Sequence, residues 1–109
     1  MLLDPSTMET KVIPHFNGGE GELHAKMFTD GMCKILLGTL APGSSIGLHT
    51  HDTTSETIYI LRGTGTEICD GQEEALRPGV CHYCPKGSSH TMINTGTEEL
   101  AFFAVVPVQ

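Results

Sequence analysis

The stretch GSSIGLHTHDTTSETIYILRG, residues 43–63, decides the fold. Alternate side chains of a strand point to the same face, so His49 and His51 can both project into the interior of a sheet or barrel. Glu56 follows a short polar connection, DTTS, and opens the β-prone run TIYILR. Two imidazoles and a carboxylate placed in this way indicate either a solvated polar loop or part of a metal site whose remaining ligand lies elsewhere in the chain.

A second stretch, GVCHYCPKGSSHTMIN at residues 79–94, has its own regular spacing of glycine, proline, histidine and asparagine. The fixed positions of the two stretches are Gly43, His49, His51, Glu56 and Gly63, then Gly79, Pro85, Gly87, His90 and Asn94. Together the two stretches resemble the two signature motifs of the cupin superfamily, with every fixed position filled. The motifs and the segment between them span residues 43–94, about half of the chain.

This resemblance implies an all-β fold, an antiparallel β-barrel or double-stranded β-helix of the jelly-roll kind. It also implies a metal site in which His90 joins His49, His51 and Glu56 as a ligand. We expect one divalent ion per chain, Fe, Mn, Ni or Zn, because ligands of this type do not select among these metals. Such a ligand set leaves coordination positions open, which is typical of catalytic rather than structural sites.

Glycine and proline are spread along the whole chain, which has 13 glycines and 6 prolines in 109 residues. The segments between them are short and β-prone, among them LHAKMF, CKILLGTL, TIYILR, TEIC, VCHYC, HTMIN and LAFFAVVPV. Short strands with frequent turn signals are typical of a β-sandwich or barrel. We expect one domain, with residues 21–109 as a single cupin barrel and residues 1–20 as an N-terminal arm or short edge segment. Residues 1–11 fit either a short helical turn or an extended arm.

The net charge is −7, from 13 acidic and 6 basic residues without a Lys/Arg cluster, which argues against nucleic acid as a partner. No apolar run approaches the ~20 residues that cross a bilayer, so we expect no membrane partner. The N-terminus lacks the pattern of a signal peptide. We therefore expect a cytoplasmic protein whose four cysteines are free thiols.

Strand alternation predicts which side chains face the interior. Ile58 and Ile60 share the face of Glu56, and Met92 shares the face of His90, so the wall around the metal is expected to be apolar. Tyr59 then points to the opposite face. Of Phe102 and Phe103, one faces in and the other faces out, and Asn94 is expected to anchor a turn through its side-chain amide.

Other histidines and the cysteines are further site candidates. His15, His24 and His82 are expected to be surface histidines or histidines satisfied within strands. The run Cys81–Cys84 resembles a CxxC element, but its cysteines flank a strand and should point to opposite faces. A single thiol lining the barrel, Cys69 or Cys84, is the more plausible arrangement.

Charged candidates are few within the two motif segments. Arg62 and Lys86 lie next to turn glycines, which argues against a sugar-phosphate substrate that needs several cations. Lys26, Lys34 or Arg77 could reach the pocket from neighbouring strands. Glu67 is a candidate acid–base residue.

We therefore expect a metal-dependent enzyme that acts on a small oxygen-bearing substrate by dioxygenase- or decarboxylase-like chemistry. One alternative is a non-catalytic, metal-containing protein that binds or senses a small molecule, and another is a metal-dependent lyase or isomerase. Some cupin lyases carry a tyrosine two residues after the glutamate, where this chain has Ile58. A metal that only ties strands together in a structural dimer is a further alternative. A homodimer is expected in each case, since exposed strand edges favour pairing.

Overall fold

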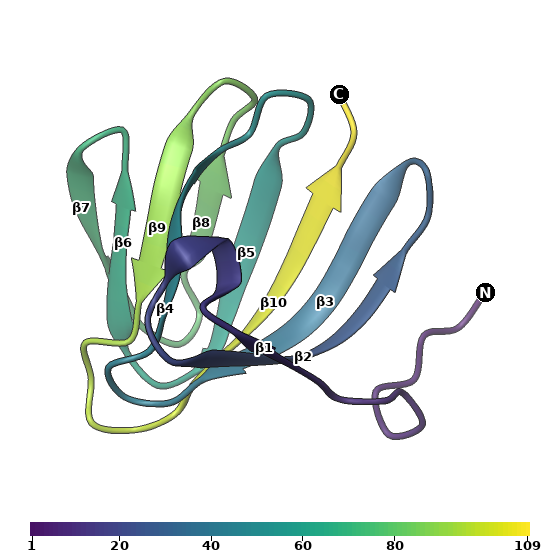
Figure 1. Cartoon of the computed structure of the whole chain (residues 1–109), viewed down its shortest axis with the longest axis horizontal. Coiled ribbons are helices and arrows are strands. Elements are labelled where there is room, and N and C mark those ends of the chain that lie inside the picture. The colour runs from purple at the N-terminus through teal and green to yellow at the C-terminus, as the bar shows by residue number, and fades with distance from the viewer.

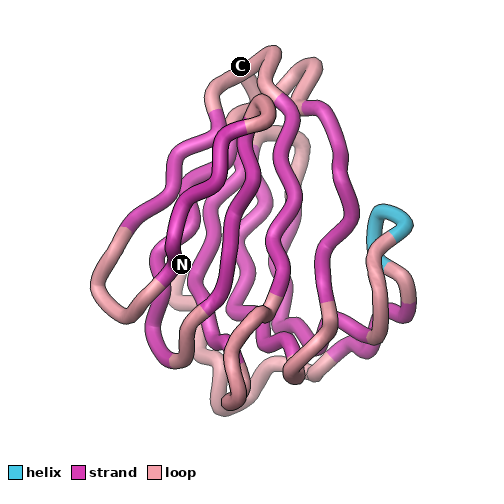
Figure 2. Tube along the Cα trace, turned by 90° about the vertical axis from the view of Figure 1, so that its left-hand side faces the viewer, coloured by secondary structure: helices cyan, strands magenta, loops and turns pink.

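The computed structural model describes residues 1–109 and consists of ten strands and one short 3-10 turn (Figures 1 and 2). The strands are β1 (Lys11–Pro14), β2 (Glu22–Thr29), β3 (Cys33–Leu40), β4 (Ser45–Thr50), β5 (Glu56–Arg62), β6 (Gly65–Cys69), β7 (Gln72–Leu76), β8 (Cys81–Cys84), β9 (Ser89–Ile93) and β10 (Leu100–Pro107). The 3-10 turn, η1, spans Phe16–Gly18. No helix in the structure has the length and apolar character needed to cross a membrane.

The strands form two antiparallel sheets that face each other (Figure 1). One sheet has the order β1-β2-β3-β10-β5-β8, and the other has the order β4-β9-β6-β7. β10 therefore lies between β3 and β5, and β9 lies between β4 and β6, as in a jelly roll. The predicted all-β jelly-roll class is confirmed, although the two sheets form an open sandwich rather than a closed barrel.

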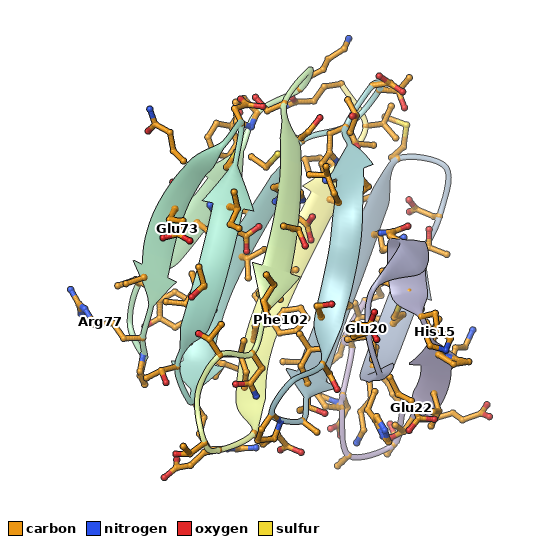
Figure 3. The ribbon with its side chains drawn as sticks, turned by 60° about the vertical axis from the view of Figure 1, so that its left-hand side comes forward. His15, Glu20, Glu22, Glu73, Arg77 and Phe102 are labelled. Atoms are coloured by element: carbon orange, nitrogen blue, oxygen red, sulfur yellow. The ribbon has the colours of Figure 1, made fainter.

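The hydrophobic core lies between the sheets and follows the predicted alternation. Ile58 and Ile60 are fully buried, whereas Tyr59 between them is 44% exposed. Phe102 is buried and lies within the fold in Figure 3. Phe103 is 37% exposed on the outer face of the sheet. Both predictions are confirmed. The packed residues are Leu23, Ala25, Leu36, Leu40, Ile46, Ile58, Ile60, Leu76, Met92, Leu100, Phe102 and Ala104.

Two residues of the motifs, Gly63 and Asn94, are required by the turns that follow β5 and β9. Gly63 has a φ of +83°, and a side chain there would also overlap the backbone of Glu99, so glycine is required on both counts. Asn94 is buried and acts as the predicted turn anchor. Its Nδ2 donates to the carbonyls of Leu40 and Glu98, both at 2.8 Å, and its Oδ1 accepts the N–H of Gly96 at 3.0 Å.

The N-terminal segment runs along the edge of the larger sheet. β1 pairs with β2 in the register Lys11↔Ala25, and Nζ of Lys26 donates to the carbonyl of Pro5 at 2.6 Å. The turn η1 then packs on β4, where a side chain at Gly47 would overlap the carbonyl of Asn17. This close approach places η1 beside the part of β4 that carries His49.

Candidate metal centre

The structure brings the four motif residues together from three strands. His49 lies in β4 directly opposite His90 of β9, and Glu56 is the first residue of β5. His51 follows the end of β4, and its N–H donates to the carbonyl of Ser88 at 3.0 Å. This hydrogen bond continues the pairing of the first motif with the second beyond the end of β4. One ligand atom from each of the four residues lies within 4.8 Å of the others.

The distances among these atoms fit a common central ion. Nε2 of His90 lies 2.9 Å from Nε2 of His51 and 3.1 Å from Nε2 of His49. Oε1 of Glu56 lies 3.0 Å from Nε2 of His90, 3.1 Å from Nε2 of His51 and 3.9 Å from Nε2 of His49. Ligands held ~2.1 Å from an ion at right angles to each other are ~3.0 Å apart. Most of the observed separations match this value.

The hydrogen bonds behind the imidazoles show which nitrogens face inward as acceptors. Nδ1 of His49 lies 2.8 Å from the carbonyl oxygen of Gly47, which can only accept, so Nδ1 donates and Nε2 keeps its lone pair. Nδ1 of His51 lies 2.7 Å from the hydroxyl of Thr54, which can accept in the same way. In neutral rings the Nε2 lone pairs then converge on one point together with a carboxylate oxygen. Such a donor set fits a divalent cation.

A line of buried polar groups lies behind His90. Oε1 of Glu67 is 2.8 Å from Nδ1 of His90, and Nε2 of His82 is 3.0 Å from the same nitrogen. Nδ1 of His82 donates to Oε1 of Glu74 at 2.7 Å, near the surface. A carboxylate behind a ligating histidine fixes the orientation of the ring and raises its basicity.

These contacts shift the acid–base properties of the centre. Burial favours a higher pKa for Glu56, but the imidazoles of His49, His51 and His90 around its carboxylate outweigh burial and hold that pKa well below the usual range. Burial raises the pKa of Glu67. For His90, burial alone would lower the pKa, but Glu56 and Glu67 on its two sides raise it to about 9. In the metal-free protein a proton on His90 therefore partly offsets the two carboxylates.

A cavity of about 370 Å³ opens in front of His49, His51 and Glu56. Its other lining residues are Phe16, Asn17, Leu23, Thr29, Asp30, Cys33, Lys34, Leu36, Ile46, Thr54, Phe102, Val106 and Val108. The carboxylate of Asp30 accepts the N–H groups of Met32 and Cys33, at 2.8 and 2.9 Å, and so serves the turn before β3. The cavity therefore has the candidate metal centre on one side and a largely apolar wall on the other.

Of the three cations considered from the sequence, Lys34 alone lines this cavity. Lys26 is held by Pro5 on the outside of the sheet, and Arg77 lies exposed after β7, pointing away from the fold (Figure 3). Glu67, the candidate acid–base residue, is not among the lining residues and lies behind His90. Its contact with a candidate metal ligand makes it a positioning residue rather than a group that meets a ligand in the cavity.

The cysteines and the remaining histidines are placed as follows. Cys81 is exposed and Cys84 is buried, so the two ends of the CxxC run face opposite ways, as predicted. Cys84 is fully buried in the interior of the fold, which agrees with the predicted thiol lining the barrel. Neither Cys84 nor Cys69 lines the main cavity, where Cys33 is the lining cysteine. Burial raises the pKa of the Cys84 thiol to about 12.

His15 and His24 are exposed, as predicted. His82 is a buried strand histidine whose two nitrogens both have partners, which is one of the predicted outcomes. The sequence did not predict that His82 lies next to His90. The only sequence signal was its spacing two residues before Cys84, which places both on one face of β8.

A two-sheet jelly roll that gathers three histidines and a glutamate beside an interior cavity defines a cupin-type protein with a candidate metal centre. The chain belongs to the Cupin domain family, whose model matches residues 36–106. The match includes all four candidate ligands.

Two relatives and one solved structure extend the comparison. The chain is 31% identical over 112 residues to the "Oxalate-binding protein" of Thermotoga maritima, covering 97% of this chain and 93% of that protein. A crystal structure described as a predicted oxalate decarboxylase from Thermotoga maritima superposes with a TM-score of 0.94 at 30% identity, covering all of both chains. An uncharacterized protein of Methanocaldococcus jannaschii is 32% identical over 79 residues, which are 72% of this chain and 62% of that protein.

Proposed function

We propose that this protein is a metal-dependent cupin that binds a small carboxylate, such as oxalate, at one divalent ion. The observation that carries the proposal is the convergence of His49, His51, Glu56 and His90 beside a cavity, which the first three of these residues line. The relative from Thermotoga maritima that matches nearly the whole chain is named for oxalate binding, which supports the choice of ligand.

Different residues would bind the ion and contact the ligand. His49, His51, Glu56 and His90 would hold the ion, which supplies a Lewis acid for a carboxylate or carbonyl oxygen when bound. Three neutral imidazoles and one carboxylate leave a divalent ion with a net charge of about +1, which favours an anionic ligand. The ammonium group of Lys34 adds a second positive charge at the cavity wall.

The size and lining of the cavity favour ligands somewhat larger than oxalate as well. Its volume of about 370 Å³ lies at the lower end of the range of small-molecule sites. Leu36, Phe102 and Val106 form an apolar wall, and a bound oxalate ion would make no contact with it. We therefore include 2-oxo acids and 2-hydroxy acids with a short apolar chain in the proposed ligand class, because they can chelate an ion through two oxygen atoms.

Turnover of the bound carboxylate, by decarboxylase- or dioxygenase-like chemistry, is our second candidate. The observation that favours it is the direct opening of the centre to a cavity, since purely structural ions are enclosed by protein ligands. Lys34 is the cationic group that could deliver a proton to a product in this cavity. Release of CO₂ from oxalate, or consumption of O₂ with a 2-oxo acid, would distinguish turnover from binding. A lyase or isomerase stays the third candidate.

The decisive experiment is a calorimetric titration of the Mn²⁺-loaded protein with oxalate. We expect binding that disappears in the metal-free protein and in the His51→Ala variant, because the ion provides the main contact. Lys34→Met should weaken oxalate binding severalfold, whereas Lys26→Met, which removes a cation outside the cavity, should leave it unchanged. Equal oxalate binding with and without metal would contradict the proposal, as would no binding to the loaded protein.

We also propose that the protein forms a homodimer through the outer face of the six-stranded sheet. Tyr59 of β5 and Phe103 of β10 are paired neighbours on that face, and they are 44% and 37% exposed. Leu61, 48% exposed, extends this apolar surface. Light scattering should give about twice the mass of one chain, and Phe103→Glu should return it to the monomer value.

A further inference from the structure

A second cluster of metal-ligating atoms lies behind the candidate centre. It consists of Cys69, at the end of β6, and His82 and Cys84 of β8. The two sulfurs and a ring nitrogen of His82 lie within 4.8 Å of one another. The cluster spans the two sheets, since β6 and β8 belong to different ones.

The strand pairing places this cluster directly beside the first centre. Cys69 is opposite His90 in the β6–β9 pair, and Cys84 is opposite Glu56 in the β5–β8 pair. The side chains of His82 and His90 also meet, with 3.0 Å between Nε2 and Nδ1. The two clusters are therefore in direct contact, but none of the three side chains of the second cluster lines the main cavity.

The donor types and spacing suit a tetrahedral, thiolate-preferring ion. In a tetrahedral zinc site with bonds of ~2.3 Å to sulfur and ~2.0–2.1 Å to nitrogen, neighbouring donor atoms are ~3.5–3.8 Å apart. Side chains that already lie within 4.8 Å of one another reach such separations by small rotations. These three side chains provide three donors, and a water molecule would complete the tetrahedron. Glu74 lies next to the cluster, where its Oε1 accepts a hydrogen bond from Nδ1 of His82 at 2.7 Å and orients that ring.

Access and charge also fit an ion at this position. Glu74 is half exposed and Cys69 is partly exposed, so an ion can enter from the solvent side of β6 and β7 while Cys84 is buried beneath them. Two thiolates neutralise a divalent ion, so the filled cluster would not repel the first centre with its net charge of about +1.

We propose that Cys69, His82 and Cys84 form a second metal site that binds Zn²⁺, with water as the fourth ligand. Soft thiolate ligands select zinc, whereas the imidazole and carboxylate ligands of the first centre also accept Mn²⁺ or Fe²⁺. The two sites thus differ in the ions that they prefer, although Zn²⁺ can bind to both. Because His82 belongs to the second site and contacts His90 of the first, occupation of one site changes the surroundings of a ligand of the other.

The test uses Co²⁺ as a spectroscopic probe of the full-length, reduced protein. Cobalt bound by thiolates absorbs strongly in the near ultraviolet through sulfur-to-metal charge transfer, whereas an ion held only by nitrogen and oxygen does not. We expect this absorption to grow as Co²⁺ is added, and Zn²⁺ to remove it. Zinc titration should end at about two ions per chain, one for each site.

Variants show which thiols are responsible. Cys69→Ser changes a partly exposed residue and should abolish the absorption, while zinc still binds at about one ion per chain. Cys84→Ala should do the same, with circular dichroism as a check that this buried substitution leaves the fold intact. Cys81→Ser, an exposed thiol on the same strand, should leave the absorption unchanged.

Absence of the charge-transfer absorption in the wild-type protein would overturn the second site. Its persistence in Cys69→Ser would do so as well, because the sulfur ligand would then lie elsewhere. Neither result bears on the carboxylate-binding function, which depends on ligands without sulfur.

Discussion

Glu67 lies 2.8 Å from Nδ1 of His90, on the side of the ring opposite to the other candidate metal ligands. The carboxyl group of Glu67 is fully buried, and neither oxygen makes a well-aligned hydrogen bond. Burying a carboxylate in this way is costly unless a nearby charge compensates for it. His90, when it is protonated or holds a metal ion, is the group that compensates.

Replacing Glu67 by Gln should weaken metal binding at the first centre. The amide keeps the shape of the side chain but removes the charge that orients His90 and makes it more basic, so we expect a roughly 10–100-fold loss of Mn²⁺ affinity. Competition with a chromogenic chelator measures the change. Glu73→Gln, an exposed substitution on β7, is the matched control and should bind like the wild type. Equal affinities of the two variants would show that Glu67 does not support His90.

The metal-free protein should lose stability between about pH 6.5 and pH 9. The folded-state pKa of His90 is raised from 6.5 to about 9, so the proton on His90 stabilises the folded state fully below pH 6.5 and this stabilisation is lost as the pH rises through 9. Urea unfolding in the presence of a chelator, at a series of pH values, measures the effect. The metal-saturated protein should not show this decline, because the ion takes the place of the proton.

Metal affinity should rise over the same pH interval. Binding through Nε2 of His90 displaces its proton, so the apparent affinity should increase up to about tenfold per pH unit below pH 9 and then level off. The chelator competition repeated between pH 6.5 and pH 9 checks this. An affinity that stays constant across the interval would mean that His90 is already neutral in the metal-free protein.

The sequence predicted the strands with regular alternation and the ligands with regular spacing. The run CKILLGTL coincides with β3, and LAFFAVVPV with β10 to within one residue, because buried strands carry continuous apolar or alternating patterns. The four candidate ligands meet because the two motifs fix their strands relative to each other. Their grouping could therefore be predicted from the resemblance of the two motifs to the cupin signature.

Other features depend on contacts that leave no local pattern. The segment QEEAL forms β7 only because β6 pairs with it, since its own composition is polar and weakly β-prone. His15 and Asn17 both adopt left-handed backbone conformations around η1, which no turn motif indicated. The contacts of His82 with His90 and Glu67 join β8 to the opposite sheet, and spacing within one strand cannot reveal them.

Asn94 should be required for stability rather than for ligand binding. Asn94→Ala removes three hydrogen bonds and leaves the buried carbonyl of Leu40 without this donor, so we expect a loss of about 2–4 kcal/mol in the free energy of unfolding. Thr95→Ala removes an exposed hydrogen bond to Thr66 and should cost less than about 1 kcal/mol. Urea midpoints give both values. A small effect of Asn94→Ala would show that solvent replaces these hydrogen bonds.

Gly38→Ala should disturb the wall of the cavity through Phe102. Gly38 of β3 pairs with Phe102 of β10, and a Cβ at Gly38 would lie 2.5 Å from Cζ of the phenyl ring. The ring is fully buried and must shift to accept a methyl group, so we expect a destabilisation of about 1–3 kcal/mol. Gly31→Ala is the matched control, because a Cβ there meets no atom within 4 Å.

The same substitution tests whether Phe102 shapes the ligand site. Phe102 lines the cavity, so a displaced ring should reduce the affinity for a 2-oxo acid with an apolar chain more than the affinity for oxalate, which lies at the ion. Calorimetric titrations of the metal-loaded Gly38→Ala and Gly31→Ala proteins with both ligands measure this difference. Parallel losses for the two ligands would mean that the apolar wall makes no contact with the chain of the 2-oxo acid, and the ligand class would then narrow to oxalate-sized ions.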